Sequence, residues 1–162
     1  MIIVSDTSTL SGLLLINRLE LLGEVYDEVI IPKVVFDELL VLEDFGYEMT
    51  PVHEATWLKF AEPSNKELEE KLKLVLDKGE AAAIALAQEL RPNFLAIDEK
   101  KGRKVAAAMD IPIIGLMGIL MTAKRLALID SVKPVVDELL EKAGFRISKK
   151  LYARILSEIG ER

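Results

Sequence analysis

Short runs of apolar, mostly β-branched residues recur along the chain and alternate with longer amphipathic segments. The runs occupy residues 2–4, 29–31, 94–97 and 111–114, and apolar and polar positions alternate over residues 57–60. Continuous apolar runs are typical of strands buried in a parallel sheet, whereas strict alternation suits an edge strand. Strands that alternate with helices predict a three-layer α/β/α fold with a central parallel sheet of four to five strands.

The segments between these runs predict helices. Pro32 suits the first turn of a helix that continues to about residue 42, and residues 64–67 have the spacing of a capping box. Further helices are expected over residues 10–16, 18–23, 80–90, 115–128, 132–142 and 148–159, and from Asp98 to residue 109. Without a linker or an internal repeat, we expect residues 1–162 to form a single domain that closes with C-terminal helices in residues 130–162.

The composition removes several classes of chemistry. The 162 residues contain no cysteine, which excludes disulfides, thiolate zinc sites and cysteine nucleophiles. His53 is the single histidine, so a histidine-rich metal site is also excluded. The net charge of -6 gives no general attraction to nucleic acid or anionic membranes, so any surface that binds phosphate must be local.

The chain shows no targeting or membrane segment. It begins directly with the first apolar run, with no basic segment before it, so we expect no signal peptide. The longest apolar run, residues 111–121, is interrupted by Pro112 and is too short to span a bilayer. We therefore expect a cytoplasmic protein without a membrane partner.

Two aspartates come directly after apolar runs. Asp6 follows residues 2–5, and Asp98 follows residues 94–97. In a parallel sheet both side chains would lie at the carboxyl edge, where α/β folds bind their ligands. A single aspartate in such a place is about as often the N-cap of the next helix, so both interpretations stay open for this pair.

Two glutamates are expected at the same edge. The residues three and four positions from Glu38 on either side are all apolar, which predicts a buried carboxylate, and a buried charge without a partner is costly. The alternative is a glutamate whose side chain reaches out to solvent. Its helix starts at the carboxyl edge, and side chains tilt toward the N-terminus of a helix. Glu80 stands in the first turn of a helix antiparallel to the strands, where the helix dipole is the alternative explanation.

Four carboxylates close together repel one another unless protons or a cation neutralise them. Oxygen ligands, without cysteine or a suitable histidine, select Mg²⁺ or Mn²⁺. An acidic metal site with no other nucleophile predicts hydrolysis of a phosphodiester by water, because the metal acidifies the water and stabilises the leaving oxygen. The candidate catalytic and metal-binding residues are therefore Asp6, Glu38, Glu80 and Asp98.

Basic residues crowd the segment after Asp98, at Lys100, Lys101, Arg103 and Lys104. Basic side chains in the first turns of a helix oppose its dipole, so helix propensity does not explain them. Beside an acidic site in an otherwise acidic chain, they are candidates for binding a polyanion such as the phosphate backbone of a nucleic acid. The alternative is a solvated helix face.

The order of these residues resembles the PIN-domain ribonucleases, and most closely the branch related to VapC toxins of toxin–antitoxin pairs. The resemblance extends from residue 2 to residue 128. The matching segments are residues 4–8, Pro32 with Glu38, residues 79–83, residues 97–98 with 102–103, and residues 114–115 with Gly118.

This resemblance implies an endoribonuclease that cleaves single-stranded RNA with Mg²⁺ or Mn²⁺, and an antitoxin protein as a possible partner. It implies that the four carboxylates bind the metal and that Thr7 and Ser8 support them. VapC toxins carry a Thr-x-Asn-x-x-Asp stretch after the fourth strand, whereas Glu99 follows Asp98 here. Whether Glu99 replaces an acidic residue of that stretch, and with it the number of metals, stays open.

Other classes of protein fit parts of the pattern. A haloacid-dehalogenase-type hydrolase needs a second aspartate two residues after the first, where this chain has Ser8. A phospho-acceptor signalling domain does not account for the helices after residue 114. A PIN-like module that binds RNA or protein without cleaving it stays open. The apolar character of residues 10–16 and of the C-terminal helices also predicts a homodimer or an antitoxin-binding groove.

Overall fold

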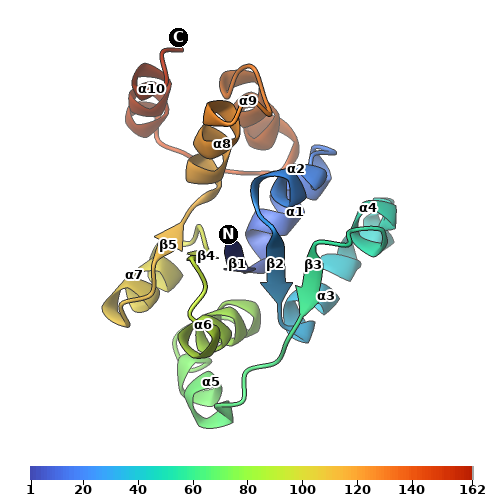
Figure 1. Cartoon of the computed structure of the whole chain (residues 1–162), viewed down its shortest axis with the longest axis vertical. Coiled ribbons are helices and arrows are strands. Elements are labelled where there is room, and N and C mark those ends of the chain that lie inside the picture. The colour runs from blue at the N-terminus through green and yellow to red at the C-terminus, as the bar shows by residue number, and fades with distance from the viewer. Residues whose placement is uncertain (162) are drawn as a thin grey trace.

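The computed structural model describes residues 1–161, and within them five parallel strands form one sheet flanked by helices. The strands are β1 (Ile2–Ser5), β2 (Glu28–Ile31), β3 (Leu58–Phe60), β4 (Phe94–Ala96) and β5 (Ile113–Ile114). Their order across the sheet is β3-β2-β1-β4-β5 (Figure 1). The predicted α/β class, the parallel sheet and the edge position of residues 57–60 are confirmed.

The strand order changes direction between β1 and β4. β2 and β3 are added on one side of β1, and β4 and β5 on the other. Ile3 of β1 pairs with Val29 of β2 on one side and with Phe94 of β4 on the other. The pairing with β4 continues past the strand, since the backbone N–H of Asp6 donates to the carbonyl of Ala96 at 3.0 Å. A reversal of this kind opens a crevice at the carboxyl ends of the two strands, where α/β sheets bind ligands.

Each face of the sheet is covered by its own core. Side chains alternate along β1, so that Ile3 packs into one core and Val4 into the other. The first core joins the sheet to α1 (Thr7–Leu15), α2 (Glu20–Val25), α3 (Lys33–Leu40), α4 (Thr50–His53), α8 (Leu116–Arg125) and α9 (Lys133–Lys142). The second core joins it to α5 (Lys66–Leu72), α6 (Lys78–Leu90) and α7 (Lys100–Ala108). The three predicted layers are therefore present.

Helix α1 begins earlier than its apolar pattern predicted. Asp6 is the N-cap, so the helix starts at Thr7 rather than at Leu10. Leu10, Leu13 and Leu14 are buried in the first core against other helices of the same chain. The apolar residues of this segment, whose pattern predicted a homodimer or an antitoxin groove, are therefore covered by other helices of the same chain.

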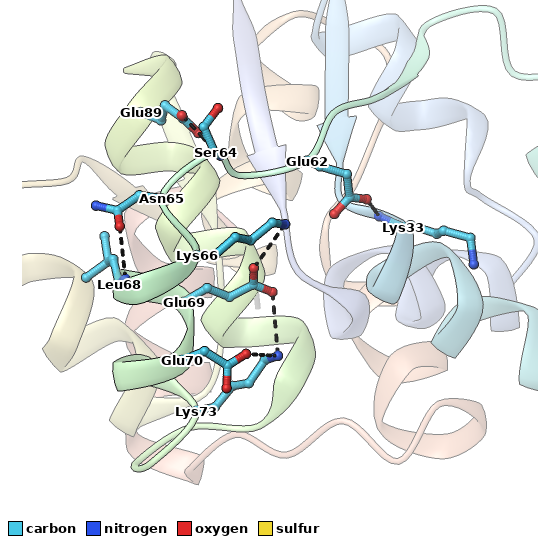
Figure 2. A network of polar contacts seen from close by, with 10 residues as sticks. All are labelled: Lys33, Glu62, Ser64, Asn65, Lys66, Leu68, Glu69, Glu70, Lys73 and Glu89. Atoms are coloured by element: carbon cyan, nitrogen blue, oxygen red, sulfur yellow. Dashed lines mark hydrogen bonds and ion pairs between the residues drawn. The ribbon is translucent and has the colours of Figure 1, made fainter.

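Helix α5 is held by local polar contacts (Figure 2). Its N-cap is Asn65, whose Oδ1 accepts from the backbone N–H of Leu68 at 3.0 Å. The predicted capping box is wrong, because the backbone N–H of Ser64 donates to Glu89 in the last turn of α6. Two lysines also pair with the buried Glu69. These contacts fix α5 beside α6 and so place the turn that leads into the N-terminus of α6.

The C-terminal helices α8, α9 and α10 (Lys149–Glu158) gather at the top of the view in Figure 1. The carboxylate of Glu161, just after α10, fastens them together. Its Oε2 accepts from Lys124 Nζ of α8 at 2.8 Å, and its Oε1 accepts from the backbone N–H of Lys133, at the start of α9, at 2.9 Å. None of the helices in residues 1–161 has the length and hydropathy that a bilayer span requires.

Hydrogen bonds keep Glu161 ionised. Burial would raise the pKa of this carboxyl, but the bonds from Lys124, from the backbone of Val132 and Lys133, and from Ser131 outweigh it and lower the pKa to about 2. A carboxyl with a lower pKa in the folded than in the unfolded protein stabilises the fold above its unfolded pKa, and this contribution is lost as the pH falls through its folded pKa.

Replacing Glu161 by glutamine should lower the free energy of unfolding by roughly 1–2 kcal/mol at pH 7, because hydrogen bonds to a charged group are lost. The difference from the wild type should shrink as the pH falls from about 4.5 toward 2, and urea unfolding at pH 7 and pH 3 measures it. The control is Glu158→Gln, which removes a surface pair with Arg154 and should cost under about 0.5 kcal/mol. The same loss for Glu161→Gln at both pH values would contradict the assignment.

Candidate metal centre

Asp6 occupies the crevice between β1 and β4 and is only 1% exposed. Its Oδ1 accepts from the backbone N–H of Thr9 at 3.2 Å, and its Oδ2 accepts from Ser8 Oγ at 2.9 Å. The residue is thus both the N-cap of α1 and a carboxylate at the ligand-binding edge. The N-cap interpretation is therefore confirmed for Asp6, and its role as a ligand stays a prediction.

Three further carboxylates converge beside α6. One oxygen from each of Asp77, Glu80 and Glu99 lies within 4.8 Å of the others. Asp77 is the N-cap of α6 and accepts from the backbone N–H of Glu80 at 2.9 Å, which holds the two residues together. Glu80 is 6% exposed, and within residues 1–161 its buried Oε2 has no hydrogen-bond partner. An unpaired buried carboxylate oxygen is costly, so the arrangement favours a bound cation or proton.

Glu38 borders the same region but is exposed, so the predicted burial of its carboxylate is wrong. The prediction assumed a helix that continues to residue 42, whereas α3 ends at Leu40 and a 3₁₀ turn (Val41–Phe45) follows, in which Val41 is exposed. The position at the carboxyl edge does match the expectation. The Oε2 of Glu38 accepts from Thr7 Oγ1 at 3.1 Å.

Asp98 takes a different direction from the other carboxylates. Its two oxygens lie 3.0 and 3.2 Å from the backbone N–H of Leu116, the first residue of α8, and Thr9 Oγ1 donates to it at 3.4 Å. It is close enough to Asp6 for each charge to disfavour the other. Its side chain, however, lines a second cavity and not the one that the other carboxylates share.

The first cavity has a volume of about 260 Å³. Its lining residues are Asp6, Thr7, Ser8, Ser11, Glu38, Asp77, Glu80 and Glu99. The structure therefore brings together three of the four predicted ligands and the three supporting residues. Asp77 was not among the predicted ligands. An aspartate three residues before Glu80 is the signal of an N-cap, and this signal could have identified it.

Burial raises the pKa of each central carboxyl. The pKa of Asp6 rises to about 6, although the hydrogen bonds from Thr9 and Ser8 oppose the shift. Burial, together with Asp77 and Glu99, raises the pKa of Glu80 to about 9. Burial also raises the pKa of Asp98, and the pKa of Glu38 is raised although that residue is exposed, because its carboxyl end lies against Gly79 and is partly shielded from water. Without a cation, the centre therefore holds protons near neutral pH.

The donor set fits a hard divalent cation. Only carboxylate and hydroxyl oxygens line the first cavity as side-chain donors, which are the ligands that Mg²⁺ and Mn²⁺ prefer. Two glycines leave room for the carboxylates. A Cβ on Gly79 would lie 2.6 Å from Glu38 Oε1, and one on Gly102 would lie 2.4 Å from Glu80 Oε2. The backbone of α6 and α7 thus approaches these oxygens closely.

The four predicted RNA-binding residues differ in where they lie. Arg103 is half-buried, and its Nη1 donates to the carbonyl of Ile97 at 2.8 Å. Lys100, Lys101 and Lys104 are exposed and line neither the first nor the second cavity. Of the four, only Arg103 therefore lines one of these two cavities.

Comparison with known proteins agrees with this geometry. The family model DUF3368, described as a PIN domain, matches residues 2–161. The chain belongs to the PIN-domain family. PIN domains are generally nucleases that use divalent metals, and the acidic cluster of this PIN domain offers a place for one. No curated protein matches the chain significantly.

Mn²⁺ should stabilise this PIN domain against heat. At a concentration of about one hundred times its dissociation constant, the ion should raise the melting temperature by roughly 5–10 °C. Because Glu80 has a raised pKa, Mn²⁺ must displace a proton, so the increase should be larger at pH 8 than at pH 6. Thermal unfolding with Mn²⁺ and with EDTA measures it.

The matched variants for this measurement are Glu80→Gln and Glu67→Gln. Glu80→Gln should abolish most of the increase yet keep about the stability of the wild type in EDTA, because the metal-free Glu80 already holds a proton and glutamine is likewise neutral. Glu67 is exposed on α5 and pairs only with Lys71, so its variant should respond like the wild type. An equal response of both variants would exclude Glu80 as a ligand.

Gly102→Ala should weaken Mn²⁺ binding although Gly102 is buried. The added methyl group must displace Glu80 Oε2 or the side chain of Ile97, which its Cβ would approach to 2.6 Å. Gly12→Ala in α1 is the control, because its Cβ would meet Leu116 and Leu139 at ordinary distances of 3.4 and 3.5 Å. Calorimetric titration with Mn²⁺ compares them, and unchanged affinity in Gly102→Ala would show that the centre tolerates the shift.

Proposed function

We propose that this PIN domain is a metal-dependent endoribonuclease that hydrolyses phosphodiester bonds of single-stranded RNA. The observation that carries the proposal is the unpaired buried oxygen of Glu80, surrounded by Asp77 and Glu99 in a cavity that also contains Asp6. A group of buried carboxylates lowers the stability of the fold when no cation is bound. A cation that binds there offsets this loss of stability. Membership of the PIN-domain family supports the same conclusion.

Asp6, Glu80, Asp77 and Glu99 are the proposed ligands, and Glu38 adds a carboxylate at the rim. Mg²⁺ or Mn²⁺ bound there would supply a Lewis acid that neutralises phosphate charge and makes water acidic enough to attack at neutral pH. Asp98, which was predicted as a fourth ligand, has an indirect role in this proposal. Thr9 contacts both Asp98 and Asp6, so Asp98 helps to position Asp6 and the N-terminus of α1.

The side chains around the ligands orient them. Ser8 donates to Asp6, and Thr7 donates to Glu38, so each hydroxyl fixes the direction of one carboxylate. Outer partners of this kind maintain the geometry and basicity of metal ligands. Arg103 supplies a cation beside the acidic centre that can contact a phosphate of the RNA.

The finer biological role follows from the resemblance to VapC toxins. It supports a toxin inhibited by an antitoxin protein and active in the cytoplasm. The proposed homodimer now rests on the C-terminal helices, where Leu140 of α9 is 37% exposed, since the apolar residues of α1 are covered. The alternative is a PIN-like module that binds RNA or protein without cleaving it.

Cleavage of a labelled single-stranded RNA tests the proposal. We expect cutting with Mn²⁺ or Mg²⁺, none with EDTA, and a rate at least about one hundredfold lower for Asp6→Asn and Glu80→Gln, since even outer partners of metal ligands cost about 10- to 100-fold. Asp110→Asn is the control, because Asp110 precedes β5 at the opposite edge of the sheet. Metal binding without cleavage of any RNA would favour the binding module, and cutting that persists in EDTA would refute the metal-dependent mechanism.

A further inference from the structure

A second cavity adjoins the metal centre. It has a volume of about 850 Å³ and lies between the carboxyl edge of the sheet, α1, α8 and the C-terminal segment of residues 143–155. Ser8, Ser11 and Glu99 line both cavities, so the two adjoin each other. Its volume falls in the range of roughly 300–1,000 Å³ that is common for small-molecule sites. We call it the C-terminal cavity.

The two walls of the C-terminal cavity are largely apolar. Ile114 of β5 and Met117 of α8 form one wall, and Phe145, Ile147 and Leu151 form the other. The second wall belongs to the segment that Glu161 fastens to α8 and α9. An apolar slot with an aromatic ring suits a flat, weakly polar group such as a nucleobase.

Each wall also carries a cation. Arg103 is held in place by its bond to the carbonyl of Ile97, and it lies against Gly115 so closely that a Cβ there would be 2.9 Å from its Nη1. Arg146 is exposed on the opposite wall. The negative charge of Asp98 is offset by the backbone N–H of Leu116 and by Arg103. Glu99 also lines the cavity on the side of the metal centre, so the lining carries two carboxylates and two arginines. In a chain with a net charge of -6, the arginine on each wall gives the cavity local positive charge that can contact a phosphate.

We propose that the C-terminal cavity is a nucleotide subsite, which holds the base and sugar of the RNA residue next to the cleaved phosphodiester. The base lies between the apolar walls, and Arg103 and Arg146 contact the phosphates that flank it. Because the two cavities share lining residues, a nucleotide in this cavity lies one step along the RNA from a phosphate at the metal centre. The proposal rests on the proposed function for the identity of the ligand, but its geometry requires no cleavage.

The methyl group of Met117 provides a direct test, because Met117 lines the C-terminal cavity and Met49 and Met109 do not. In the wild-type protein with ¹³C-labelled methionine methyl groups and EDTA, a mixture of nucleoside monophosphates should shift the NMR signal of Met117. Inorganic phosphate alone should not shift it, and the signals of Met49 and Met109 should stay in place. No shift, or an equal shift with phosphate alone, would overturn the nucleotide subsite.

Two matched pairs of variants test the walls by fluorescence anisotropy of a labelled single-stranded RNA in EDTA. Arg146→Glu should weaken binding about tenfold, whereas Lys150→Glu, an equal charge change four residues away, should have little effect. Leu151→Ala should weaken binding about threefold, whereas Leu90→Ala, an equally exposed leucine at the end of α6 and outside the cavity, should not. Equal effects within either pair would contradict the proposal.

The outcomes separate the subsite from the nuclease. A protein that cleaves RNA normally while Arg146→Glu and Leu151→Ala bind and cleave like the wild type would leave the nuclease standing and remove the subsite. A protein that cleaves no RNA, but whose Met117 signal shifts with nucleoside monophosphates, would keep the subsite and refute the proposed hydrolysis. A peptide ligand of the cavity would leave the Met117 signal unchanged by nucleotides, which also refutes the subsite.

Discussion

The removal of carboxylates from water at the carboxyl edge of the sheet is the constraint on which the rest of this structure depends. Asp6 is almost fully buried, but two hydrogen bonds compensate it. Glu80 is nearly as buried, and its Oε2 has no partner within the described chain. Burial of this kind lowers the stability of the metal-free fold and is tolerated because the well-packed cores on both faces of the sheet supply the stability. The acidic centre thus lowers the stability of the fold locally, and the packing of the rest of the domain compensates for it.

The positions of these carboxylates explain several residues around the centre. Gly79 and Gly102 stand inside or at the start of helices, where alanine would be more stable by about 0.5–1 kcal/mol, and both lie against a carboxylate oxygen. Asp77 caps α6 and at the same time brings a third oxygen to Glu80. Secondary structure and site are therefore built from the same residues.

The sequence predicted the fold well because its signals are local. Apolar runs, Pro32 and the positions of Asp6 and Asp98 at strand ends define the layers and the ligand-binding edge. The errors arose where tertiary contacts choose between local options. Glu38 is exposed because α3 ends at Leu40, and Asn65 replaces Ser64 as the N-cap because the backbone of Ser64 bonds to Glu89.

The candidate site was predicted less completely for the same reason. Sequence periodicity places residues on a helix face or at a strand end, but it does not say which way a side chain turns. Asp98 turns toward the N-terminus of α8 instead of joining the other carboxylates. Asp77 and Glu99 join Glu80 only because the α5–α6 turn and the start of α7 meet at that edge, which is a property of the packed molecule.

The attachment of α10 has a consequence for how the molecule opens. Of the residues of α10, only Ile155 and Leu156 are buried, and the polar contacts of Glu161 close the far end. An element with so few buried side chains can detach as a local unfolding unit while the cores stay intact. The wall formed by residues 143–155 can then open with a low free energy while the rest of the fold stays intact. A long polymer could enter the C-terminal cavity from the side, without threading an end through the molecule.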